Sequence, residues 1–257
     1  RMKVGNYCSR LGGRKVLVVT DATLKALTWL NDVLQSLANA GMDAEVYAGV
    51  SPNPRDFEVM QGAELYRQHK CNMIVALGGG SVIDCAKGIG IVSTNHKNIG
   101  EFEGVDCIDK PMPPLICIPS TCGSAADVSQ FAIITNSKEK YKMAIISKAV
   151  VPDVSLIDPV ILTSMDSFLT ACTGMDALSH AFESFVSNAS SAFTDLYALE
   201  AIRLIHDNLL NAVEHPDDLQ CKGKAMLGSL YAGLAFSNAS LGCVHSMADR
   251  KSTRLNS

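Results

Sequence analysis

The sequence before Asp158 alternates short, continuously apolar runs with longer stretches of helical periodicity. The apolar runs are residues 15–20 (KVLVVT), 72–77 (NMIVAL) and 115–119 (LICIP), and residues 43–50 (DAEVYAGV) are a further expected strand. Continuously apolar runs of this length are typical of strands buried on both faces of a sheet. Their regular alternation with helices predicts βαβ units and a parallel sheet covered by helices on both sides.

Helices are expected at residues 23–41, 55–70 and 82–94. In the first of these, leucines at positions 24, 27, 30, 34 and 37 recur at helical spacing, and Gly41 supplies a stop. Three further runs, at residues 128–135, 142–147 and 154–158, predict shorter strands of mixed direction.

The pattern changes after Asp158, because no further β-branched run appears. Helices are expected at residues 168–187, 192–214 and 219–237, separated by the breaks SNASS and EHPDD. The sequence therefore predicts two domains, an α/β domain over residues 1–161 and a helical domain over residues 162–248.

Composition narrows the possible functions. The chain has 257 residues, 47% of them hydrophobic and 19% charged, which is typical of a globular protein. Its net charge of −4 argues against nucleic acid as a partner, and no apolar run approaches the ~20 residues that span a bilayer. The nine cysteines lack any C-x-x-C spacing, and the N-terminus lacks a signal-peptide block, so a cytoplasmic protein with reduced thiols is expected.

A glycine-rich turn, GGGS at residues 78–81, lies between an expected strand and an expected helix. Such a turn brings free backbone N–H groups close to a phosphate, although a plain strand–helix turn would have the same sequence. Asp21 follows the first strand, where a carboxylate can bind an adenosine ribose or can cap the next helix. The segment PSTCGS at residues 119–124 could form a second wall of a nucleotide site or an ordinary hydroxyl-stabilised turn.

Asp176 and His180 are four residues apart in GMDALSHAFESF, so a helix places them on one face. The pair could bind a metal ion, or it could form a hydrogen bond within a core. A metal needs at least three protein ligands, and His245 in LGCVHSMA is the candidate for the third.

The ordered set GGGSVIDCAKGIG, PSTCGSAADVS, GMDALSHAFESF and LGCVHSMA resembles the iron-containing alcohol dehydrogenase family. The resemblance runs from KVLVVTD to about Met247. It implies an N-terminal Rossmann-like NAD-binding domain with a parallel sheet, followed by an incomplete all-α domain, in an architecture similar to that of dehydroquinate synthase.

The resemblance also implies the site residues. Asp176, His180 and His245 match ligands of a divalent iron, or of zinc in some relatives. The positions that match coenzyme-binding residues are Asp21, Asn53, Gly79, Gly80, Ser81, Ser120, Thr121, Ser124 and Lys142.

The implied activity is an NAD-dependent, iron-dependent interconversion of a small primary alcohol or diol and its aldehyde, in which the metal polarises the substrate oxygen. A zinc-dependent polyol dehydrogenase of the glycerol type and an inactive nucleotide-binding fragment are the alternatives. A homodimer is expected only because it is the commonest oligomer.

The end of the sequence departs from the family pattern. Asp249 stands where the family has a further histidine, and residues 249–257 (DRKSTRLNS) cannot continue an apolar helix. We expect these residues to be a non-native tail on a C-terminally truncated fragment, with weak iron binding, little activity and a tendency to aggregate.

Overall fold

The computed structural model describes residues 1–247. The chain forms two compact units. The first unit contains Arg1–Pro119 and Gln130–Leu156, and the second contains Ser120–Ser129 and the chain from Ile157 onward.

A five-stranded parallel sheet forms the centre of the first unit, in the order β2-β1-β3-β5-β8. The strands are β1 (Lys15–Asp21), β2 (Asp43–Val50), β3 (Met73–Gly78), β5 (Leu115–Pro119) and β8 (Val154–Ser155). Every residue of β3 and β5 is buried, as the continuously apolar runs predict. The predicted α/β class with a parallel sheet is confirmed.

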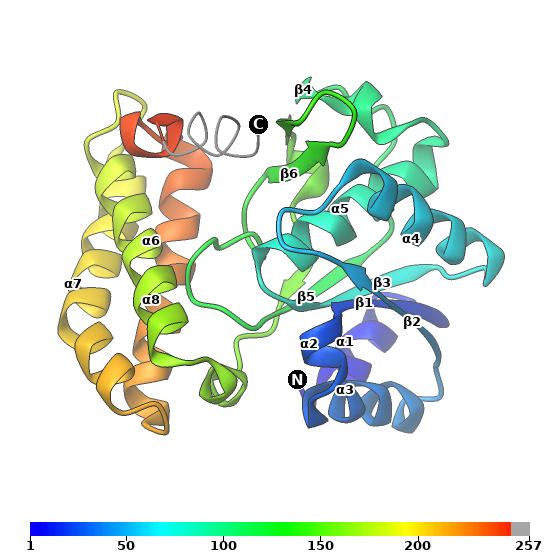
Figure 1. The fold of residues 1–257 in the computed structure, drawn as a ribbon, viewed down its shortest axis with the longest axis horizontal. Coiled ribbons are helices and arrows are strands. Elements are labelled where there is room, and N and C mark those ends of the chain that lie inside the picture. The colour runs from blue at the N-terminus through cyan, green and yellow to red at the C-terminus, as the bar shows by residue number, and fades with distance from the viewer. Residues whose placement is uncertain (248–257) are drawn as a thin grey trace. The chain divides into compact units, whose positions relative to one another are not determined.

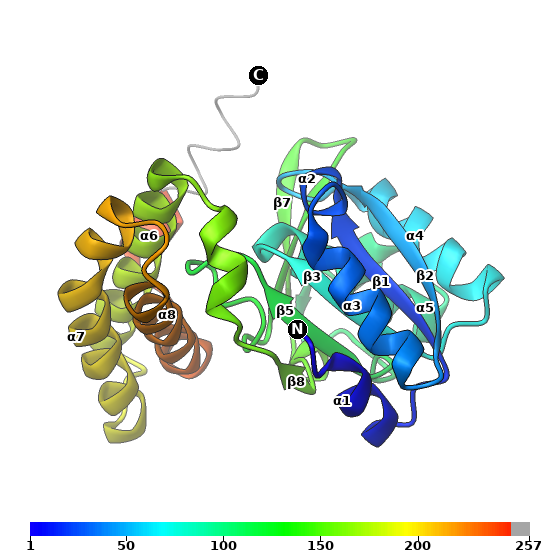
Figure 2. The same ribbon diagram turned by 90° about the horizontal axis from the view of Figure 1, so that it is seen from below.

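Helices cover both faces of this sheet (Figure 1). On one face α4 (Asp56–Gln68) packs against α5 (Gly80–Asn95), and α5 contacts β1, β3 and β5. On the other face lie α1 (Val4–Arg10), α2 (Ala22–Lys25) and α3 (Thr28–Asn39), of which α1 packs against α3. Figure 2 looks onto this second face, with α3 lying along the sheet.

The predicted continuous helix at residues 23–41 is wrong, because the chain breaks between α2 and α3. Leu27 adopts an extended conformation (φ −95°, ψ 160°) at the start of α3, and this resets the helical phase. Val33 therefore joins Leu30 and Leu37 in the core, whereas Leu34 is only partly buried. The expected stop is confirmed, since Gly41 has φ +74°.

A second, three-stranded sheet lies beside α5 in the same unit, in the order β4-β7-β6. The strands β6 (Phe131–Asn136) and β7 (Tyr141–Ile146) pair antiparallel, and β4 (Gly104–Val105) pairs parallel to β7. The 3-10 helices η1 (Ile99–Phe102) and η2 (Lys148–Val150) complete this part of the unit.

The second unit is helical, with α6 (Ser167–Phe185), α7 (Ala192–Glu214) and α8 (Leu219–Ala239) packed on one another and η3 (Pro159–Ser164) packed on α8. Small residues allow the helices to approach closely. A side chain at Gly174 would overlap Leu209, and one at Gly228 would overlap Ile205.

The segment Ser120–Ser129 groups with the helical unit, whereas the sequence placed it within a domain of residues 1–161. Packing explains this difference. Cys122 clusters with Leu162, Met165 and Met226, and the hydroxyl of Ser229 donates a hydrogen bond to the carbonyl of Gly123.

All nine cysteines are free thiols, as their spacing predicts. Within residues 1–247 no helix is both long and apolar enough to cross a bilayer. The expectation of a non-native tail at residues 249–257 lies outside the described residues.

Candidate functional site

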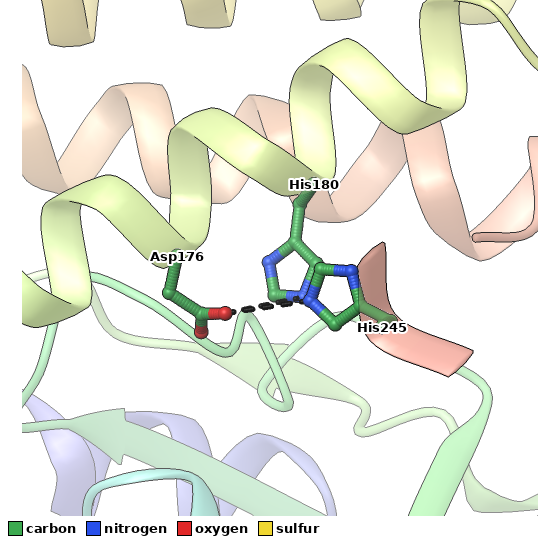
Figure 3. Close-up of side chains that lie close together, drawn as sticks. All are labelled: Asp176, His180 and His245. Atoms are coloured by element: carbon green, nitrogen blue, oxygen red, sulfur yellow. Dashed lines mark hydrogen bonds and ion pairs between the residues drawn. The ribbon is translucent and has the colours of Figure 1, made fainter. Parts of the chain in front are cut away.

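The three predicted metal ligands lie together in the helical unit. Helix α6 carries Asp176 and His180 one turn apart, and a helical turn at residues 243–247 brings in His245. One ligand atom from each residue lies within 4.8 Å of the others. Oδ1 of Asp176 is 3.4 Å from Nε2 of His245 and 3.9 Å from Nε2 of His180. Figure 3 shows the Asp176 carboxylate pointing toward the two neighbouring imidazoles.

The two imidazoles stack, with 4.3 Å between ring centroids and 15° between ring planes. Phe236 of α8 packs against His180 at a centroid distance of 4.6 Å. His180 is buried, and among the described residues its Nδ1 finds no hydrogen-bond partner. The side chain of Asp176 is 44% exposed, so the cluster is accessible from the carboxylate side.

The side chains of the cluster shift one another's pKa values. Burial lowers the pKa of His180, although the nearby Asp176 carboxylate partly opposes this. Burial alone would raise the pKa of Asp176, but its hydrogen bond with His245 and the two imidazoles outweigh burial and lower it. The same hydrogen bond raises the pKa of His245. An ionised carboxylate beside a neutral His180 is the protonation state that a cation requires.

The donor set fits a divalent transition metal. Two imidazole nitrogens and one carboxylate oxygen suit ferrous iron or zinc, and three protein ligands leave positions open on either metal.

Glu183 belongs to the cluster but was not predicted from the sequence. Its carboxylate is 8% exposed, and Oε2 lies 2.5 Å from Nδ1 of His245. Its Oε1 accepts a hydrogen bond of 2.6 Å from the backbone N–H of Val244. The spacing held a signal, since Glu183 follows Asp176 by seven residues and His180 by three, which places all three side chains on one helix face.

The glycine turn lies at the edge of the parallel sheet. Gly79 is the N-terminal cap residue of α5, and a side chain at Gly78 would overlap Val82. The strand order reverses between β1 and β3, because β2 lies on one side of β1 and β3 on the other. Ligands of open α/β sheets bind at the carboxyl ends of strands at such a point, and here those ends carry Asp21 and Gly79.

Asp21 has the structural role that the sequence left open, since Oδ1 accepts the backbone N–H of Leu24 at 2.9 Å and caps α2. Asn53 and Ser81 meet, because the backbone N–H of Asn53 donates to the Ser81 hydroxyl at 3.2 Å. Asn53 adopts φ +54°, and Thr135 of β6 donates to its carbonyl. Asp21, Asn53, Gly79, Gly80, Ser81 and Lys142 of β7 all belong to the first unit.

Ser120, Thr121 and Ser124 belong to the helical unit. The Ser124 hydroxyl accepts the backbone N–H of Ala126 at 3.4 Å, which is the hydroxyl-stabilised turn that the sequence allowed. Ser120 is buried and Thr121 is partly exposed.

The first unit has a parallel sheet with a glycine turn at its switch point, and the helical unit carries an Asp–His–His cluster. These features define a two-unit α/β protein with a candidate metal centre. The family model described as iron-containing alcohol dehydrogenase matches residues 1–159, and the model of that family's C-terminal part matches residues 170–256. The chain belongs to the iron-containing alcohol dehydrogenase family.

The chain is also similar to individual proteins whose sequences or structures are known. The chain is 42% identical to 1,3-propanediol dehydrogenase from Citrobacter freundii over 95% of its own length, and 35% identical to NAD-dependent methanol dehydrogenase from Bacillus methanolicus over 96%. It spans 64% and 65% of the lengths of these two relatives. A crystal structure of a 1,3-propanediol oxidoreductase matches the whole chain with a TM-score of 0.97 and 39% identity, and 67% of that protein is covered.

Proposed function

We propose that this protein is an NAD-dependent, metal-dependent alcohol dehydrogenase that interconverts a small primary alcohol or diol and its aldehyde. The observation that carries the proposal is the convergence of Asp176, His180 and His245 on one point. The names of the two similar proteins, a 1,3-propanediol dehydrogenase and a methanol dehydrogenase, support a small alcohol as the substrate class.

The metal is held by Asp176, His180 and His245 in this proposal. When bound, it would supply Lewis acidity toward the substrate oxygen, and NAD would supply the hydride acceptor. The residues themselves contribute charge and position. The Asp176 carboxylate supplies a negative charge, and the ring contacts of His180 with His245 and Phe236 restrict the orientation of its ring. Ferrous iron is the proposed metal, and zinc would suit the same donors.

The first unit binds the coenzyme in this proposal. The N-terminal N–H groups of α5 at Gly79, Gly80 and Ser81 would donate hydrogen bonds to the pyrophosphate, because a helix N-terminus favours an anion. Asp21 has a second carboxylate oxygen besides the one that caps α2, and it would accept hydrogen bonds from the adenosine ribose. The bond from Asn53 to Ser81 holds the 51–54 loop beside this turn.

The remaining coenzyme positions are proposed from the family resemblance. Lys142, Ser120, Thr121 and Ser124 would line the nicotinamide and its ribose.

Turnover measurements test the proposal. The protein is purified without metal, loaded anaerobically with Fe²⁺ or with Zn²⁺, and assayed for NADH formation with 1,3-propanediol, methanol and glycerol. We expect NADH formation at a low rate, which requires metal and is fastest with Fe²⁺ and a primary alcohol. Preference for glycerol with Zn²⁺ would support a polyol dehydrogenase instead. NAD binding without turnover under any metal would overturn the proposal and favour a nucleotide-binding module.

A further inference from the structure

The Glu183 carboxylate bridges two groups in the segment that carries His245. It receives the Val244 N–H on Oε1 and faces Nδ1 of His245 with Oε2. Glu183 itself is fixed, because it is buried on α6 and lies on the same face as Asp176 and His180. The segment at residues 242–246 is therefore tied to the helix that carries the other two ligands.

These contacts determine which nitrogen of His245 carries a proton. An ionised carboxylate only accepts hydrogen bonds, so Nδ1 must be the donor to Glu183. Both ring nitrogens face a carboxylate, but the contact from Nδ1 to Glu183 (2.5 Å) is shorter than the one from Nε2 to Asp176 (3.4 Å). The single proton of the neutral imidazole therefore stays on Nδ1 and leaves the lone pair on Nε2. The opposite tautomer would place a proton on Nε2 and exclude a metal from it.

We propose that Glu183 is a positioning residue for the metal centre, which fixes the ring orientation and tautomer of His245 so that Nε2 is available to a metal. The inference rests on the proposed function, because it needs the metal site of Asp176, His180 and His245. Metal-bound histidines generally donate their second ring N–H to a carboxylate or carbonyl, and loss of such a partner typically weakens metal binding roughly 10–100-fold.

Glu183→Gln tests the inference with a nearly isosteric change. The Val244 N–H and the His245 Nδ1–H face different oxygens of Glu183, and glutamine has an acceptor oxygen at only one of these two positions, so in this arrangement it cannot receive both. If its amide group turns toward Nδ1, it donates there and drives the proton of His245 onto Nε2. We expect the dissociation constant for Zn²⁺, measured by competition with a chromophoric chelator, to rise roughly 10–100-fold.

The matched control is Glu200→Gln on α7, whose side chain is 42% exposed and pairs with Arg203. This variant should bind Zn²⁺ as the unmodified protein does. Equal affinity in Glu183→Gln and the unmodified protein would overturn the positioning role while leaving the metal centre intact. Absence of Zn²⁺ binding in the unmodified protein would instead overturn the metal centre and this inference together.

A measurement on the unmodified protein covers the case in which Glu183→Gln does not fold. In nitrogen-15 NMR spectra of the metal-free protein, at a pH where His245 is neutral, His245 should show a proton on Nδ1 and none on Nε2. A proton on Nε2 would overturn the inference. A merely structural Glu183 would lower the melting temperature of the metal-free Glu183→Gln variant and leave its His245 tautomer unchanged, so melting curves and nitrogen-15 spectra of the variant together separate the two roles.

Discussion

Oδ1 of Asp176 lies 3.4 Å from Nε2 of His245, although 69 residues separate them in the chain. The intervening residues form α7 and α8, and α6, α7 and α8 all pack on one another. The helical packing of the second unit therefore assembles the candidate metal centre, and its ligands meet only when that unit is folded.

His180→Ala should abolish metal retention and leave NAD binding nearly intact. The change removes one of three protein ligands. We therefore expect metal affinity to fall by more than the roughly 10–100-fold typical when a hydrogen-bond partner of a ligand is lost. NAD affinity should persist because Asp21 and the glycine turn belong to the other unit. Separate titrations with Zn²⁺ and with NAD measure the two affinities.

His206→Ala is the control, since His206 lies on α7 with a side chain that is 79% exposed. It should change neither affinity. Parallel loss of both ligands in His180→Ala would indicate that His180 is a structural core residue.

Hydrophobic patterning predicted the local elements, because each depends on neighbours in the sequence. The expected helix at residues 192–214 coincides with α7, and the strand KVLVVT differs from β1 only by Asp21. The break at Leu27 could not be predicted, since the leucines around it keep helical spacing. The spacing places Glu183 on the helix face of Asp176 and His180, but its role was missed because it depends on a contact with His245 across 62 residues.

Asp21→Gly should relax the preference for NAD over NADP, because it removes the negative charge that would repel a 2′-phosphate. The same change removes the side-chain cap of α2, and with glycine at a cap position this lowers the stability of the protein by only a few tenths of a kcal/mol. The ratio of the dissociation constants for NAD and NADP measures the preference.

Asp21→Ser separates the charge from the cap, because serine caps a helix nearly as well as aspartate. The preference should relax in both variants. Unchanged discrimination in Asp21→Ser would show that Asp21 acts only as a cap.

The stability of the first unit should depend on Asp84 in mildly acidic solution. Burial raises the pKa of Asp84 from 3.8 to about 6, although Lys87, the Ile133 N–H and Lys142 partly offset it. A raised pKa means that the stabilising contribution is complete below about pH 4 and is lost as the pH rises through 6. The free energy of unfolding should fall by at most about 3 kcal/mol over this pH range.

Asp84→Asn should lack this pH dependence, since its amide does not ionise and can still accept the Ile133 N–H. Chemical denaturation from pH 4 to pH 7 measures the free energy of unfolding of both proteins. The stability difference between them should shift in favour of Asp84→Asn as the pH rises. A constant difference would contradict the assigned pKa.

The purified chain should self-associate through α7. Leu196, Leu199 and Leu210 recur at helical spacing on one face of α7, and they are 71%, 51% and 66% exposed. Apolar surface of this kind promotes association in water. Light scattering should show a mass that rises with concentration, and Leu196→Lys should reduce it. A concentration-independent monomer would contradict this expectation.

Anomalous diffraction tests the central claim most directly. Crystals of the chain loaded with Zn²⁺ or Fe²⁺ are measured at the absorption edge of each metal. We predict one anomalous peak bounded by Oδ1 of Asp176, Nε2 of His180 and Nε2 of His245, and no such peak in Asp176→Asn crystals treated identically. A peak elsewhere, or none in crystals soaked at saturating metal, would contradict the assignment of these residues as a metal centre.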